Sequence, residues 1–153
     1  MMVDRPGRLL SQAGASFAVL PVPDLESFAA RRADPALVDI ELLTPDRLVR
    51  YLGRRVGLKS LDELAGAYMD AASVDHPEVA VPSVQDREAG LLVSFLESTP
   101  FSVTVEIQVN PELEGEILDP DGLSFDVTRA ALVTAAIELR EWLGPDATER
   151  DLQ

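Results

Sequence analysis

The sequence predicts an α+β fold with a helical first half, an antiparallel β meander and a long apolar C-terminal helix packed on the sheet. Three observations predict it: an amphipathic helical pattern begins at Ser60, polar and apolar residues alternate from Phe101 to Asn110, and a broad apolar stripe follows Thr128. Helices and strands that are segregated along the chain are typical of α+β folds rather than of doubly wound parallel sheets.

The first half contains helix candidates and two short strand candidates. Ser16 to Val22 and Val38 to Leu42 have strand-like patterns, and Asp24 to Ala33 is predicted as a short helix with Asp24 as its N-cap. Ser60 and Glu63 form a capping box, in which each side chain satisfies a backbone N–H of the first turn. The helix that follows places its apolar residues on one face, so we expect that face to be buried.

A further helix is predicted to begin at Thr44 and Pro45. Threonine is a favoured N-cap, and proline is tolerated at the first helical position because its missing N–H has no partner there. This helix is predicted to run to Leu52 and to end at Gly53. If it continued, its arginines would form a basic face beside Tyr51, and they are the predicted partner-binding residues: Arg47, Arg50, Arg54 and Arg55.

The second half is predicted to be a meander of two hairpins. Ser73 to Ser83 contains two prolines and is predicted as a loop. Leu91 to Glu97 and Phe101 to Asn110 are strands joined by a turn at Thr99 and Pro100. The second hairpin has strands at 116–118 and 123–127, with the turn Asp119-Pro120-Asp121-Gly122 between them.

The last helix is predicted to begin after the cap Thr128 and to end near Leu143, before Gly144 and Pro145. Its apolar stripe contains Leu132, Ala135, Ala136, Leu139, Trp142 and Leu143, with Val133 and Ile137 on the flank. A helix that is apolar on most sides is usually buried on two sides. We therefore expect a homodimer whose interface includes Val133, Ile137 and Trp142.

The charge is divided unevenly along the chain. The 153 residues carry a formal net charge of −14. Residues 1–59 have seven acidic and nine basic residues, whereas residues 60–153 have twenty acidic and four basic residues. This distribution favours a basic protein partner and opposes direct binding to nucleic acid, whose phosphates need positive charge.

Composition limits the class of protein. The chain has no cysteine, which excludes disulfides, zinc–thiolate sites and a cysteine nucleophile. No apolar run is long enough to span a membrane, and the first ten residues lack the apolar core of a signal peptide. We expect a cytoplasmic protein with a single domain at 8–144 and flexible tails at 1–7 and 145–153.

No catalytic residue or cofactor site can be named from the sequence. The single histidine, His76, lies between Asp75 and Pro77, and no Gly-x-Ser-x-Gly motif accompanies it. Counted from Asp119, the acidic segment lacks the residues that an EF-hand requires at positions five, six and twelve. We therefore predict no cofactor and no metal.

The interpretation that follows is a non-enzymatic, acidic protein-binding or adaptor module. A mixed sheet with a long apolar C-terminal helix, in a small acidic protein, is similar in general style to bacterial secretion-type chaperones, although the first half is more helical and no individual residues correspond. Two alternatives remain open: a small metal-assisted enzyme that uses acidic residues near the Asp119–Gly122 turn, and a nucleic-acid-associated protein that makes contact through the arginine helix.

Overall fold

The computed structural model describes residues 8–11, 13–21, 36–73, 81–110 and 121–152. In this part of the chain, strands β1 to β4 form one antiparallel sheet, here called sheet A, and strands β5 to β8 form a second, sheet B. The elements follow in the order β1 (Leu9–Leu10), β2 (Ser16–Pro21), β3 (Ala36–Leu43), β4 (Leu48–Val56), α1 (Leu58–Ser73), β5 (Val84–Asp86), β6 (Leu91–Ser98), β7 (Ser102–Val109), β8 (Asp121–Thr128) and α2 (Arg129–Leu152).

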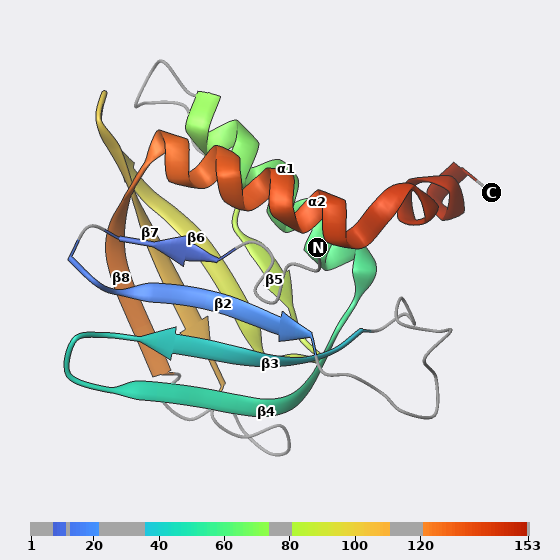
Figure 1. The fold of residues 1–153 in the computed structure, drawn as a ribbon, viewed down its shortest axis with the longest axis horizontal. Helices are drawn as coiled ribbons and strands as arrows, with labels where there is room; N and C mark the ends of the chain where they lie inside the picture. The colour runs from blue at the N-terminus through green and yellow to red at the C-terminus, as the bar shows by residue number, and fades with distance from the viewer. Residues whose placement is uncertain (1–7, 12, 22–35, 74–80, 111–120, 153) are drawn as a thin grey trace.

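The two sheets and two helices surround one hydrophobic core. In Figure 1 sheet A lies in front of sheet B with its strands crossing those behind, and α1 and α2 lie side by side along one end of both sheets. Fully buried side chains come from every layer, for example Phe17 and Ile40 from sheet A, Ile107 from sheet B, Tyr68 from α1 and Leu139 from α2. Apolar burial on this scale is the main favourable contribution to folding.

Both helices contact sheet B, and α2 also contacts sheet A. Helix α1 follows sheet A but lies against β5 and β6 of sheet B, while α2 follows β8 and also contacts β1 of sheet A. The first strand of each sheet is therefore next to a helix, whereas the last strand of each sheet, β4 or β8, forms the opposite edge. The two halves are thereby joined through their helices.

The α+β prediction with a helical first half is wrong. The described part of the first half is a four-stranded antiparallel sheet followed by α1, and the fold is mostly β. The largest single error is the helix predicted from Thr44 to Leu52, because this segment forms a turn and then the nine-residue strand β4.

The turn before β4 explains the error. The Thr44 side-chain oxygen accepts hydrogen bonds from the N–H groups of Asp46 at 3.3 Å and Arg47 at 3.1 Å. An N-cap threonine also accepts from residues two or three positions later, so the local chemistry of a cap and of this turn are alike. The backbone N–H of Thr44 bonds to the carbonyl of Arg47 at 2.8 Å, which closes the hairpin between β3 and β4.

A β-bulge interrupts β4 at its centre. Val38 pairs with Arg54 and Ile40 with Tyr51, so one residue of β3 faces two residues of β4. Gly53 occupies the bulge with φ of +65°, a conformation that costs other residues strain, and its N–H bonds to the Asp39 carboxylate at 2.9 Å. The extra residue shifts the inward and outward alternation of the side chains by one position, so apolar residues of this segment recur at the three- and four-residue spacing of a helix.

Several other elements match their predictions. The strands at 16–22, 38–42, 91–97 and 101–110 correspond to β2, β3, β6 and β7, and β6 and β7 form the predicted hairpin. The helix predicted after Ser60 is α1, but it begins at Leu58, and Leu61 donates its N–H to the carbonyl of Gly57. The N–H of Gly57 bonds to Asp86 at 2.9 Å, so a carboxylate from β5 supports this helix start.

The remaining boundaries differ from expectation. Strand β5 lies just past the predicted loop, and β8 begins at Asp121, so Asp121 and Gly122 pair with β7 instead of completing a turn. Thr128 does cap α2, since it accepts the N–H of Ala131 at 3.1 Å, but the helix extends to Leu152 rather than ending near Leu143. The predicted helix at 24–33 and strand at 116–118 lie outside the described residues.

Candidate binding surfaces

The four predicted partner-binding arginines do not share one face. Arg47 is exposed in the turn before β4, and Arg50 and Arg55 lie on the outer face of sheet A, which points away from the core. Arg54 lies on the opposite face of the same strand and is only 4% exposed. The basic helix face predicted from the sequence is therefore absent, and three of the four arginines remain at the surface.

Arg54 connects the two sheets inside the protein. Its guanidinium donates a hydrogen bond to the carbonyl of Ala89 at 2.9 Å, in the turn between β5 and β6, and lies 5.3 Å from the centre of the Tyr51 ring. Burial lowers the pKa of Arg54, and its electrostatic interaction with Tyr51 partly opposes that change. These contacts give Arg54 a structural role.

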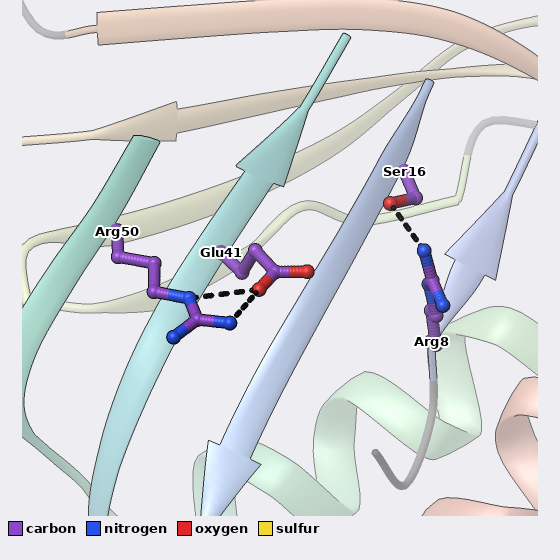
Figure 2. A network of polar contacts seen from close by, with 4 residues as sticks. All are labelled: Arg8, Ser16, Glu41 and Arg50. Atoms are coloured by element: carbon purple, nitrogen blue, oxygen red, sulfur yellow. Dashed lines mark hydrogen bonds and ion pairs between the residues drawn. The ribbon is translucent and has the colours of Figure 1, made fainter. Parts of the chain in front are cut away.

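A carboxylate is buried on the outer face of sheet A. Glu41 of β3 is 2% exposed, and its Oε2 accepts from both Nε and one terminal nitrogen of Arg50, each at 2.9 Å, as Figure 2 shows. Arg8, which immediately precedes β1, donates a hydrogen bond at 3.4 Å to the hydroxyl of Ser16, the first residue of β2. An arginine that binds a buried carboxylate is held in place, so Arg50 is positioned by the sheet.

Exposed leucines accompany the arginines along β4. Leu48 is 52% exposed and Leu52 is 70% exposed, and both lie on the outer face together with Arg50. On a helix these two leucines would lie opposite the arginines. Their exposure on a strand was not predicted, and only the correct strand register could have revealed it.

The outer face of sheet B is polar and acidic. Strands β5 to β8 contain no lysine or arginine, and three of their five acidic residues, Glu97, Glu106 and Asp126, lie on the outer face, whereas Asp86 binds the N–H groups of Gly57 and Ala89. Short side-chain bonds cross this face: Thr104 donates to Asp126 at 2.6 Å, and Gln108 donates to Glu106 at 3.1 Å. Glu97 lies opposite Thr104, and Glu106 lies opposite Ser94 in the register of β6 and β7.

One end of this face is apolar. Phe101, in the turn between β6 and β7, is 83% exposed, and Leu96 is 53% exposed. Leu96 is the extra residue of a bulge in β6, where Phe95 pairs with Val105 and Glu97 pairs with Thr104. The alternating pattern of β7 in the sequence includes Phe101 as an apolar strand residue and gives no sign that it is exposed.

The predicted dimer residues on α2 have different environments. Ile137 is 50% exposed, Val133 is partly buried, and Trp142 is partly buried and packed against the core. The exposed apolar area on the described part of this helix is therefore small. The homodimer remains a prediction.

A fully buried tyrosine hydroxyl lies between α1 and sheet B. The ring of Tyr68 meets that of Phe95 edge-to-face with centres 6.2 Å apart, and its hydroxyl has no hydrogen-bond partner among the described residues. Burial alone raises the pKa of Tyr68. The hydroxyl stays protonated in this apolar environment, and its main contribution is the packing of the ring.

The acidic cluster around Asp119 and the single histidine fall largely outside the described residues. His76, Glu114, Glu116 and Asp119 are among the residues without a described position. In the segments that are described, no three histidine or acidic side chains lie close enough to hold a metal ion. Nor does any helix in those segments have the length and apolarity needed to cross a membrane.

Comparison with known proteins supplies no family for this fold. No family model, no curated protein and no solved structure matches the chain.

Proposed function

We propose that this protein is a non-enzymatic binding or adaptor module of the chaperone-like kind, and that the outer face of sheet B engages a basic protein partner. The observation that carries the proposal is the set of three acidic residues on the outer face of sheet B, Glu97, Glu106 and Asp126, on strands without a single lysine or arginine. Charge of one sign on one sheet attracts a partner of opposite sign and orients its approach.

The two sheets differ in the charges that their strands carry. Sheet A carries three arginines and two acidic residues on its strands, so its charge is nearly balanced, whereas sheet B carries only acidic charge. Leu96, next to Glu97 in β6, and Phe101, in the turn after β6, add exposed apolar side chains. An arginine- or lysine-rich segment with an apolar anchor has the chemistry that complements this combination.

The alternatives gain no supporting observation. Nucleic-acid binding through an arginine helix loses its geometric basis, because the segment is a strand and Arg54 is buried. The metal-assisted enzyme depends on residues near Asp119 that are not described. A cytoplasmic location belongs to the proposal, because a cysteine-free chain with no apolar span suits a reducing compartment.

Binding of a fluorescent arginine-rich peptide, measured by anisotropy, tests the proposal. The double variant Glu97→Gln and Glu106→Gln should weaken binding by about threefold to tenfold, since each exposed ion pair contributes about 0.2–1 kcal/mol. The matched control is Glu63→Gln with Asp70→Asn, which removes the same charge from exposed positions on α1. An equal loss in both variants would show that only the total charge matters, and the proposed face would be wrong.

A further inference from the structure

The two sheets each end in a strand whose outer edge has no neighbour in the described part of the chain. Strand β4 pairs with β3 and β8 pairs with β7, while the strands at the other edges, β1 and β5, lie next to helices. Figure 1 shows β4 and β8 at separate borders of the molecule. An edge strand presents backbone N–H and C=O groups that can pair with a further strand.

The edge of β4 is only partly protected. Natural proteins protect an edge by a short strand, a covering element, charged side chains or a bulge, and β4 has exposed arginines and a bulge. However, the strand is nine residues long, and its outer face exposes Leu48 and Leu52 at 52% and 70%. The bulge at Gly53 bends the strand but leaves both leucines exposed.

The charges of β4 select the kind of strand that can pair with it. Arg50 and Arg55 are exposed along β4, and Arg50 is held by Glu41. A pairing of β4 with β4 of a second copy would bring these arginines near one another, and like charges on adjacent strands are destabilising. An acidic strand avoids this repulsion.

The chain itself contains such a strand. β8 is eight residues long, carries no basic residue and has Asp126 on the outer face of sheet B. The Asp126 side chain is exposed, where it accepts a hydrogen bond from Thr104. The two free edges of the protein are thus similar in length and opposite in charge.

We propose that β4 of one copy pairs with β8 of a second copy, so that sheet A of one molecule continues into sheet B of the next. The contact is head-to-tail and leaves one free β4 and one free β8, so it builds rings or open chains rather than a two-fold dimer. The net charge of −14 on each copy opposes association, but the arginines and aspartates of the two edges would lie within the roughly 8–10 Å over which charges are unscreened.

The proposal does not depend on the proposed function, because it uses the strand edges, and its test changes Asp126 and Arg55 whereas the test of the acidic face changes Glu97 and Glu106. It also differs from the dimer predicted through α2. That dimer relies on Ile137, whereas the head-to-tail contact relies on Arg55 and Asp126.

Light scattering combined with size exclusion tests the contact, with protein concentrations raised to about 1 mM to detect weak association. The wild type should show a mass that rises with concentration. Arg55→Glu and Asp126→Arg should each be monomeric, since each disables one of the two edges. Their 1:1 mixture should regain association, because the intact β8 of the first variant can pair with the intact β4 of the second, and the two reversed edges are also opposite in charge.

The matched controls are Lys59→Glu and Asp70→Arg, which make the same charge changes at exposed positions on α1 and should associate like the wild type. Circular dichroism should show that all four variants remain folded. The proposal would be overturned if the wild type were monomeric or if the mixture stayed monomeric. It would also be overturned if the controls associated as weakly as the edge variants. So would association that survives both edge variants and is lost in Ile137→Lys.

Discussion

Replacement of Arg129 should destabilise the protein more than replacement of any exposed arginine. Arg129 is the first residue of α2, and its guanidinium joins three segments that are distant in the sequence. One terminal nitrogen donates to the carbonyls of Ala71 at 2.9 Å and Ala72 at 3.1 Å, near the end of α1. The other donates to the Ser98 hydroxyl and the Thr99 carbonyl, both at 2.7 Å.

The size of the effect follows from these contacts. A hydrogen bond to a charged group contributes about 1.5–3 kcal/mol, and a cation at a helix C-terminus adds about 0.3–1 kcal/mol. The Thr99 contact is exposed and the other three are partly buried, so water can replace part of the loss in the variant. We expect Arg129→Met to lower the free energy of unfolding by about 2–4 kcal/mol.

Urea unfolding followed by circular dichroism measures this change. A loss near 3 kcal/mol corresponds to a Tm lower by about 6–12 °C for a domain of this size. Arg129→Lys keeps the charge but cannot reach four acceptors, so it should lie between Arg129→Met and the wild type. Arg140→Met, at an exposed position on the same helix, is the control. A change below about 1 kcal/mol in Arg129→Met would refute the reasoning, because it would mean that water replaces all four contacts.

Three further predictions concern groups inside the fold. Tyr68→Phe should keep or slightly raise stability at pH 7, because the buried hydroxyl has no hydrogen-bond partner among the described residues. In the wild type the raised pKa keeps Tyr68 protonated in the folded state while the unfolded tyrosine ionises, so stability is present below about pH 10 and falls above it. The variant should lose less stability above that pH, and urea midpoints on either side of it measure the difference. Gly53→Ala should lower the free energy of unfolding by about 1–2 kcal/mol, because its positive φ is strained for alanine and nothing else is in contact. Gly90→Ala should lower it further, because the new Cβ would also lie 2.9 Å from the Cβ of Asn110. Equal shifts in Tm for the two variants would contradict this. Asp86→Ala should cost about 1–3 kcal/mol in urea unfolding, because the N–H groups of Gly57 and Ala89 lose their acceptor, and Asp86→Asn should recover part of that cost.

Two Thr-Pro turns show where sequence reasoning succeeds and where it fails. Thr99 and Thr44 make the same set of bonds: each accepts N–H groups from residues two and three positions later and donates its own N–H to a carbonyl at 2.8 Å. The sequence predicts a hairpin turn at Thr99, because a fault-free alternation follows it. At Thr44 the same dipeptide predicts a helix cap, and that prediction is wrong.

The difference lies in the strand that follows each turn. In β7 the residues alternate between the buried and outer faces along the whole strand. In β4 the bulge at Gly53 shifts the alternation by one residue, and Leu48 and Leu52 are exposed rather than buried. Apolar residues on both faces at three- and four-residue spacing resemble a helix. Only pairing with β3 decides the structure, and that is a long-range interaction.

The candidate surfaces were predictable only in part. The division of charge near residue 59 is visible in the sequence, whereas its meaning depends on topology. The burial of Arg54 and Glu41 and the exposure of Phe101 depend on register and turn geometry, which composition does not determine.

The change of charge near residue 59 coincides with a boundary in the fold. Residue 59 lies at the start of α1, the element that connects sheet A to sheet B, so the change of charge falls between the two sheets, and five of the twenty acidic residues after it lie on the strands of sheet B. Because α1 packs on β5 and β6 while α2 reaches β1, neither sheet can bury its apolar face without an element from the other half. The halves are therefore combined in one core, while their outer faces keep different chemistry. The acidic outer face of sheet B and the leucine–arginine edge of β4 are therefore two chemically different surfaces on one core.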